Sequence, residues 1–142
     1  MEENKPKTTR ILIVEDHSGL RESLAKWVTD LFPDINVSQA STGEEGISLA
    51  LKICPDIILM DIGLPDINGI NATREILKKG LTAKVIIITG LIGEIYREQA
   101  LEVGAIAFLG KNELNRHLLS TIGRLIGREE EAEGKICFNN ML

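Results

Sequence analysis

Short apolar runs alternate with amphipathic stretches along most of the chain, and this alternation restricts the fold more than any other sequence feature. Five short apolar runs, in which isoleucine and valine are frequent, occupy residues 11–14, 35–40, 57–60, 85–88 and 105–109. Three of them, which read ILIV, IILM and VIII, are continuously apolar, as is typical of strands covered on both faces. The second run is more polar and therefore suits an edge strand.

The stretches between these runs have helical periodicity, and most begin with a residue that favours a helix start. The predicted N-caps of the first, second, third and fifth helices are Ser18, Thr42, Asn68 and Asn112. Thr42 and Glu45 also have the spacing of a capping box. Gly104 follows the fourth apolar stripe, where glycine favours a helix end. The chain therefore alternates strand and helix throughout.

This order of elements predicts an α/β domain with a parallel sheet and right-handed crossovers. Ligands of such sheets bind beyond the carboxyl ends of the strands, so chemistry is expected there. The pattern covers residues 10–127. Residues 1–9 are predicted to be a disordered N-terminal extension, and residues 128–142 a linker or C-terminal tail.

Composition excludes several classes of protein. The net charge of −5 argues against direct nucleic-acid binding by this segment, which would need a basic surface. No apolar run approaches the roughly 18 residues of a membrane span, and the polar N-terminus lacks a signal-peptide core. We therefore expect no membrane contact and a cytoplasmic location. Cys54 and Cys137 lack metal-type spacing and are expected to be inert thiols.

Charged and hydroxyl side chains follow four of the predicted strands. Glu15 and Asp16 come after the first strand, Asp61 ends the third, Thr89 ends the fourth and Lys111 follows the fifth. Each residue alone has an ordinary explanation as a turn, strand or surface residue. Three carboxylates at one sheet edge repel one another unless a cation neutralises them. Oxygen ligands suit Mg²⁺, and acids with a hydroxyl and a lysine suit phosphoryl chemistry.

Four segments carry a resemblance to a known family; they read VEDHSGLRESL, DIILMDIGLPDINGI, KVIIITG and GAIAFLGK. Together they resemble the receiver domain of bacterial two-component response regulators, and most closely receivers of the LuxR/NarL type. The resemblance implies a CheY-like, flavodoxin-like three-layer sandwich. Its doubly wound sheet would have five parallel strands in the order 2-1-3-4-5.

The resemblance also implies a set of residue roles. Asp61 would accept a phosphoryl group from a sensor histidine kinase in a Mg²⁺-dependent reaction, with Mn²⁺ as a possible substitute. Asp16, Asp61 and the backbone carbonyl of Gly63 would bind the metal, and Glu15 would bind it through a water molecule. Lys111 would neutralise a phosphoryl oxygen.

Two further residues would form the switch that the resemblance implies. Thr89 would donate a hydrogen bond to the phosphoryl group, and Phe108 would change the position of its ring in response. The surface made by the fourth helix, fifth strand and fifth helix would then carry the output. Gly63 and Gly90 replace larger family residues, which predicts a phosphate open to water. Gly93 predicts a loose switch region.

The output lies outside the chain on this interpretation. The protein would be a signalling domain rather than an enzyme, would form a phosphorylation-dependent homodimer, and would regulate an effector such as a DNA-binding domain. Alternatives are a stand-alone phosphorelay regulator, a receiver that signals by binding alone, and a haloacid-dehalogenase-like phosphatase. The phosphatase would need D-x-D-x-T after the first strand, where this chain has EDHSG. His17 and His117 are expected to be surface histidines.

Overall fold

The computed structural model describes residues 8–90 and 94–128. Gly93, predicted to loosen the switch region, and Cys137, predicted to be an inert thiol, lie outside these ranges. A single five-stranded parallel sheet has the order β2-β1-β3-β4-β5, as predicted. Its strands are β1 (Arg10–Val14), β2 (Asn36–Ala40), β3 (Ile57–Asp61), β4 (Lys84–Thr89) and β5 (Ala107–Gly110). The more polar strand β2 lies at one edge, also as predicted.

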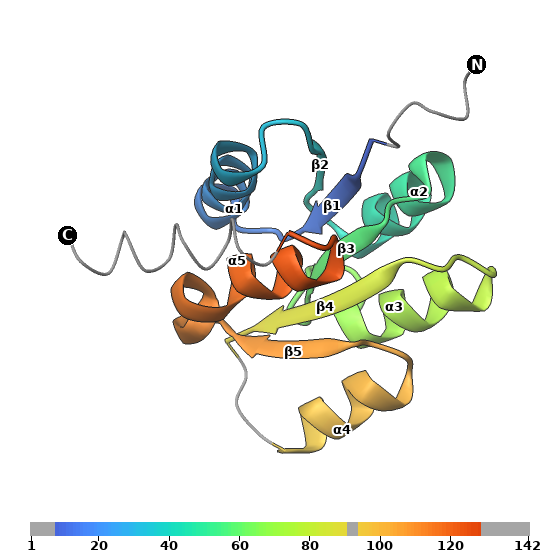
Figure 1. The fold of residues 1–142 in the computed structure, drawn as a ribbon. Helices are drawn as coiled ribbons and strands as arrows, with labels where there is room; N and C mark the ends of the chain where they lie inside the picture. The colour runs from blue at the N-terminus through green and yellow to red at the C-terminus, as the bar shows by residue number, and fades with distance from the viewer. Residues whose placement is uncertain (1–7, 91–93, 129–142) are drawn as a thin grey trace.

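Helices cover both faces of this sheet (Figure 1). They are α1 (Ser18–Leu31), α2 (Gly43–Ile53), α3 (Gly69–Lys78), α4 (Glu94–Glu102) and α5 (Leu114–Leu125), with a 3-10 turn η2 (Lys111–Glu113) before the last. Helices α1 and α5 pack on one face, and α2, α3 and α4 on the other. The three-layer sandwich is therefore confirmed. No helix in the described residues is long and apolar enough to cross a membrane.

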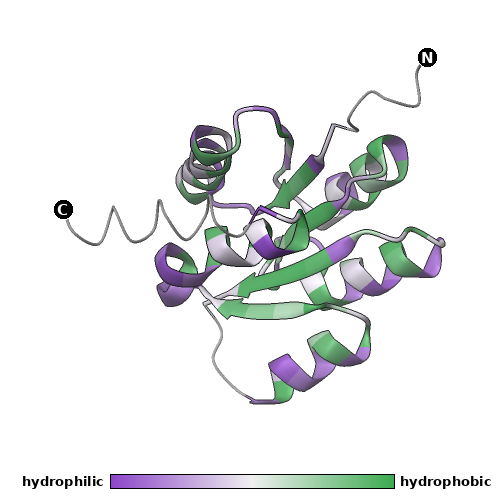
Figure 2. Cartoon of the chain, viewed as in Figure 1, coloured by the Kyte–Doolittle hydropathy of each residue, from purple (hydrophilic) through white to green (hydrophobic). Residues whose placement is uncertain are grey.

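The core consists of two apolar layers, one on each face of the sheet. Alternate strand residues such as Ile13 and Leu59 face α1 and α5, whereas Leu12 and Ile58 face the other helices. Figure 2 shows the central strands as an almost unbroken hydrophobic band between helices with mixed surfaces. Every residue of β3 is buried, which explains why its sequence is apolar up to its last residue, Asp61.

Strand register brings the polar residues of the sheet to one edge. Val14 pairs with Met60 between β1 and β3, and Asp61 pairs with Ile88 between β3 and β4. Thr89 then pairs with Gly110 between β4 and β5. Glu15, Asp61, Thr89 and Lys111 therefore leave the sheet at nearly the same level, as the parallel arrangement predicts.

Three of the predicted helix signals are confirmed. Thr42 caps α2 by accepting a hydrogen bond from the Glu45 amide at 3.1 Å, and Asn68 caps α3 through the Ile70 amide at 2.7 Å. The capping box itself is incomplete, because the Glu45 carboxylate accepts from the Ser41 amide instead. Gly104 ends the turn after α4 with φ of +110°, a conformation that glycine adopts without steric cost.

Two predicted N-caps are wrong. His17, not Ser18, caps α1: its Nδ1 accepts a hydrogen bond from the Leu20 amide at 3.1 Å, so the helix already includes Ser18. Asn112 lies inside the 3-10 turn η2, and no side chain caps α5. Strand β5 leads directly into this turn, which occupies the position where a cap was expected. His17 is exposed, as expected, but it has a structural role.

Candidate functional site

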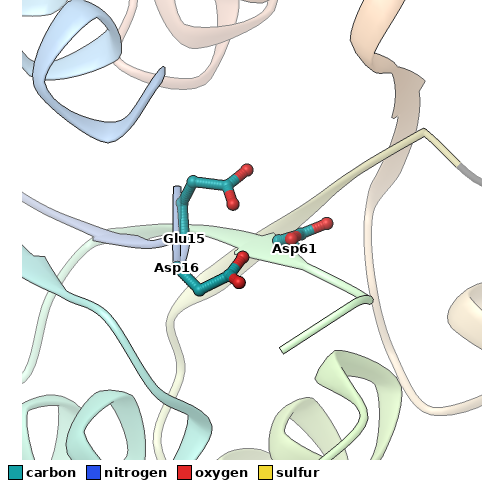
Figure 3. A group of neighbouring side chains, drawn as sticks. All are labelled: Glu15, Asp16 and Asp61. Carbon is teal, nitrogen blue, oxygen red and sulfur yellow. The ribbon is translucent and has the colours of Figure 1, made fainter. Parts of the chain in front are cut away.

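Three carboxylates from two segments gather at the carboxyl edge of the sheet. Glu15 and Asp16 lie in the loop after β1, and Asp61 is the last residue of β3. One oxygen atom of each carboxylate lies within 4.8 Å of the others. Figure 3 shows the three side chains directed toward a common space beyond the strand ends. The structure therefore brings together the acidic residues that the sequence singled out.

The carboxylates differ in their access to solvent. Glu15 is fully buried and Asp61 is 3% exposed, whereas Asp16 is exposed. Two anionic groups in a buried position need nearby cations or hydrogen-bond donors, because desolvation disfavours their charged forms. The open side of the cluster lies at Asp16, which gives a ligand from solvent an approach to the buried Asp61.

Lys111 supplies a cation to this cluster. Its Nζ lies 2.8 Å from Glu15 Oε1 and 3.4 Å from Asp61 Oδ2. Partial burial lowers the pKa of Lys111, but the carboxylates of Glu15 and Asp61 outweigh burial and raise this pKa above its usual value. Lys111 is thus held in its charged form, with its ammonium group between the two buried acids.

Glu15 is held tightly in this arrangement. Its Oε2 accepts a hydrogen bond from the His17 amide at 3.1 Å, and no described group donates a well-oriented hydrogen bond to Oε1, which faces Lys111 as an ion pair. Arg21 fixes the backbone at the same point by donating to the Glu15 carbonyl at 2.8 Å. The sequence patterns do not predict this role of Arg21, because the acceptor is a backbone carbonyl, which no residue type identifies.

The two predicted switch residues lie on neighbouring strands. Thr89 ends β4 and is 1% exposed, and Phe108 lies half-buried on β5. Arg97 of α4 places its guanidinium 5.5 Å from the centre of the Phe108 ring, a cation–π contact. Periodicity could not predict this contact, because Arg97 and Phe108 belong to different elements.

Three glycines near the acidic cluster, Gly63, Gly69 and Gly90, differ in the room that each has for a side chain. Among the described residues, the atom nearest to an added Cβ would be Asp61 Oδ2 at 4.0 Å for Gly63 and Lys111 Cδ at 3.9 Å for Gly90, so each position has room for a Cβ at ordinary van der Waals distance. At Gly69, by contrast, a Cβ would lie 1.9 Å from the Asp61 carbonyl oxygen. Gly69 therefore allows the start of α3 to pack directly against the end of β3.

The donor set of the cluster suits a hard divalent cation. Three carboxylates face one another, and Lys111 balances only part of their charge. Carboxylate oxygens, one of them exposed, are ligands that Mg²⁺ prefers, and Mg²⁺ keeps several water molecules. His117, the other predicted surface histidine, is exposed on α5, and its Nε2 lies 3.9 Å from Glu113 Oε2.

Comparison with known proteins identifies the class to which this fold and site belong. Residues 11–123 match the response regulator receiver domain, and the chain belongs to this family. It is therefore a receiver domain of two-component signal transduction. Domains of this family are signalling phosphoacceptors that histidine kinases phosphorylate, and they bind Mg²⁺ at an acidic site.

Individual relatives show which response regulators the chain is similar to. The chain is 33% identical over 129 residues to the transcriptional regulatory protein LiaR of Bacillus subtilis, covering 90% of this chain and 61% of LiaR. It is 33% identical to the nitrate/nitrite response regulator NarL of Escherichia coli, covering 86% of this chain and 56% of NarL. The chain thus spans little more than half the length of these regulators.

Solved structures agree with this assignment. A DNA-binding response regulator of the LuxR family from Staphylococcus aureus has a TM-score of 0.77 at 27% identity, covering 82% of this chain and 98% of that chain. A CheY-like receiver from Methanospirillum hungatei has a TM-score of 0.76 at 30% identity, covering 88% of this chain and 99% of that chain. The predicted similarity to LuxR/NarL-type receivers is confirmed.

Proposed function

We propose that Asp61 is the phosphoacceptor of this receiver domain. The observation that carries the proposal is the position of its carboxylate: Asp61 Oδ2 lies 3.4 Å from Lys111 Nζ and within the cluster formed with Glu15 and Asp16. A carboxylate oxygen of Asp61 would attack the phosphorus of a phosphohistidine. The new P–O bond forms an acyl phosphate as the P–N bond breaks, and the histidine nitrogen leaves with the electron pair.

The neighbouring residues support this transfer by position and charge. Lys111 neutralises a phosphoryl oxygen, and the Thr89 hydroxyl donates a hydrogen bond to another oxygen once the group is attached. Charge spread over phosphoryl oxygens in a loose transition state makes such preplaced cations and donors effective. Lys111 is already held beside Asp61 by Glu15, so little reorganisation is needed.

A magnesium ion fits the same site, with Mn²⁺ as a substitute. Asp16, Asp61 and the Gly63 carbonyl would hold it, and Glu15 would contribute through a water molecule because its carboxylate already faces Lys111. When bound, the ion neutralises the carboxylates and the incoming phosphoryl oxygens. Asp16, as the exposed member of the cluster, would be the first ligand to meet it.

The switch would run from Thr89 to Phe108 and change the surface formed by α4, β5 and α5. LiaR is named a transcriptional regulatory protein and the Staphylococcus aureus neighbour a DNA-binding response regulator, which supports a DNA-binding domain as the output. This output would be controlled through a phosphorylation-dependent homodimer in the cytoplasm. Residues 10–127 would form the receiver, without direct nucleic-acid contact. The lack of a side chain at Gly63 and Gly90 would leave the phosphate open to water and short-lived.

A phosphate-affinity gel tests the phosphoacceptor directly. Wild-type protein, Asp61→Asn and the control Asp30→Asn are incubated with acetyl phosphate and Mg²⁺; Asp30 lies on α1 and pairs with Lys26 at 2.9 Å. We expect a retarded band for wild type and Asp30→Asn, none for Asp61→Asn, and none when EDTA is added first. An unmodified wild-type protein, or a retarded Asp61→Asn band, would contradict the proposal.

A further inference from the structure

The loop of residues 62–68 connects Asp61 to α3 and carries Gly63. Backbone hydrogen bonds close the loop near its ends: the amides of Leu64 and Gly69 donate to the Ile62 carbonyl at 3.0 and 2.9 Å. Close packing of Gly69 on the Asp61 carbonyl adds a steric constraint there. These contacts fix the two ends of the loop, and Leu64 and Ile67 pack their apolar side chains against the core between α2, α3 and the sheet.

Asp66 attaches the middle of the loop to another helix. Its Oδ1 accepts a hydrogen bond from the Gly43 amide at 2.7 Å, and its Oδ2 accepts one from the Glu44 amide at 2.8 Å. Both amides belong to the first turn of α2. An added Cβ at Gly43 would lie 2.8 Å from Ile67 Cγ1, so the loop and the helix start are also in direct van der Waals contact.

The bond is electrostatically favourable. Amides in the first turn of a helix have no partner within the helix and carry partial positive charge, so they favour a carboxylate. Accordingly the hydrogen bond from the Glu44 amide, followed by that from Gly43, holds the pKa of Asp66 below its usual value. Asp66 is therefore anionic at neutral pH while it bridges the two elements.

Helix α2 does not depend on Asp66 for its N-cap. Thr42 already supplies the local cap through the Glu45 amide, and the Gly46 amide donates to the Thr42 carbonyl at 3.0 Å. Asp66 takes the two amides that remain. The bridge thus completes the start of α2 and also positions the loop next to the phosphorylation site.

We propose that Asp66 is a positioning residue for this site: by binding the first turn of α2, it holds the loop that carries Gly63, the proposed carbonyl ligand, close to Asp61. The inference rests on the proposed metal-dependent function. Because coupling between two sites is reciprocal, Mg²⁺ binding must in turn strengthen the bond between Asp66 and α2. Helix α2 thereby becomes sensitive to the state of the acidic cluster.

Magnesium titrations of the whole chain test this inference. Affinity is measured calorimetrically for wild type, Asp66→Ala, Asp66→Asn and Thr42→Ala. Thr42→Ala removes a cap from the same helix start without touching the loop. We expect Asp66→Ala to weaken Mg²⁺ binding about 5-fold or more, the lower end of typical couplings between sites. Asp66→Asn, which keeps one acceptor oxygen, should lose less, and Thr42→Ala should bind like wild type.

Amide hydrogen exchange provides a second measurement that a purely structural role would not change. In wild type, Mg²⁺ should slow exchange at Gly43 and Glu44; in Asp66→Ala it should not. If wild type binds Mg²⁺ and is phosphorylated while Asp66→Ala binds with wild-type affinity, the inference is wrong and the proposed function stands. Equal weakening in Thr42→Ala would also overturn it. Wild-type protein that neither binds Mg²⁺ nor accepts phosphate would overturn both.

Discussion

At the scale of single residues, the site depends on the ion pair between the buried Glu15 carboxylate and the partly exposed Lys111. Glu15 is fully buried and faces Lys111 Nζ at 2.8 Å, while Lys111 also reaches Asp61. Such a pair does not by itself add much stability, because removing the Glu15 carboxylate from water offsets its attraction to Lys111, whose side chain remains 30% exposed. Its effect is to keep an ammonium group beside Asp61, the proposed phosphoacceptor. Without Lys111, the Asp61 carboxylate would face Glu15 and Asp16 with no cation near it.

Removal of Lys111 should therefore cost more stability than removal of a surface lysine. Lys111→Ala leaves Glu15 as a buried charge without a cation, and we expect a loss of about 1–3 kcal/mol in the free energy of unfolding. Lys26→Ala breaks an exposed pair with Asp30 and should cost less than about 0.5 kcal/mol. Urea unfolding at neutral pH compares them, and equal losses would contradict this account of Glu15.

The two glycines next to Asp61 allow a matched comparison. Gly69→Ala would place a Cβ 1.9 Å from the Asp61 carbonyl oxygen, whereas the nearest atom to a Cβ at Gly63 lies 4.0 Å away. We expect Gly69→Ala to destabilise the domain by about 1–3 kcal/mol through overpacking. Gly63→Ala should stay within about 0.5 kcal/mol of wild type. Chemical denaturation of both variants checks the order, and a more harmful Gly63→Ala would reverse it.

At the scale of elements, sequence patterns predict the strands and the polar residues at their ends, but not the contacts between residues of different elements. Continuous apolar runs identified the buried strands, and strand-end polar residues identified the cluster at Asp61, because both signals are local. The wrong caps at Ser18 and Asn112 arose where a histidine nitrogen and a 3-10 turn replaced the expected side chain. The Asp66 bridge spans two elements, and no local pattern encodes it.

The contact between α4 and β5 yields a prediction at this scale. Arg97 lies 5.5 Å from the Phe108 ring centre, and a partly exposed cation–π contact contributes about 0.5–1 kcal/mol. Arg97→Ala should lower stability by that amount and release the ring. Arg74→Ala, which loses only a hydrogen bond to Asn71 on α3, serves as the control. Thermal unfolding together with NMR shifts of the Phe108 ring measures both effects; unchanged ring shifts would exclude the contact.

At the scale of the whole molecule, Arg128 in the segment after α5 binds Asp34 in the segment after α1. Arg128 donates to both carboxylate oxygens of Asp34, at 2.6 Å for the first, and lies over the Phe32 ring at 5.8 Å. The hydrogen bond from Arg128 lowers the pKa of Asp34 to about 2 from its usual value of 3.8. These contacts join the two segments that follow α1 and α5, the helices that pack on the same face of the sheet.

This ion pair predicts a pH dependence of stability. Because the pKa is lower in the folded state, the Asp34 carboxylate stabilises the fold above pH 3.8, and the effect disappears as the pH falls toward about 2. Asp34→Asn should therefore be less stable than wild type at pH 6, with a difference that shrinks across that interval. Unfolding by urea at several pH values measures this difference, and a constant difference down to pH 2 would contradict it.

The most direct test of the central claim locates the phosphoryl group on the chain. Acetyl phosphate and Mg²⁺ phosphorylate the protein, borohydride reduces the acyl phosphate, and peptide mass spectrometry identifies the modified residue. The account predicts that Asp61 is converted to homoserine, with no modification in Asp61→Asn. Conversion of Asp16 or another carboxylate instead, or no conversion of wild-type protein, would contradict it.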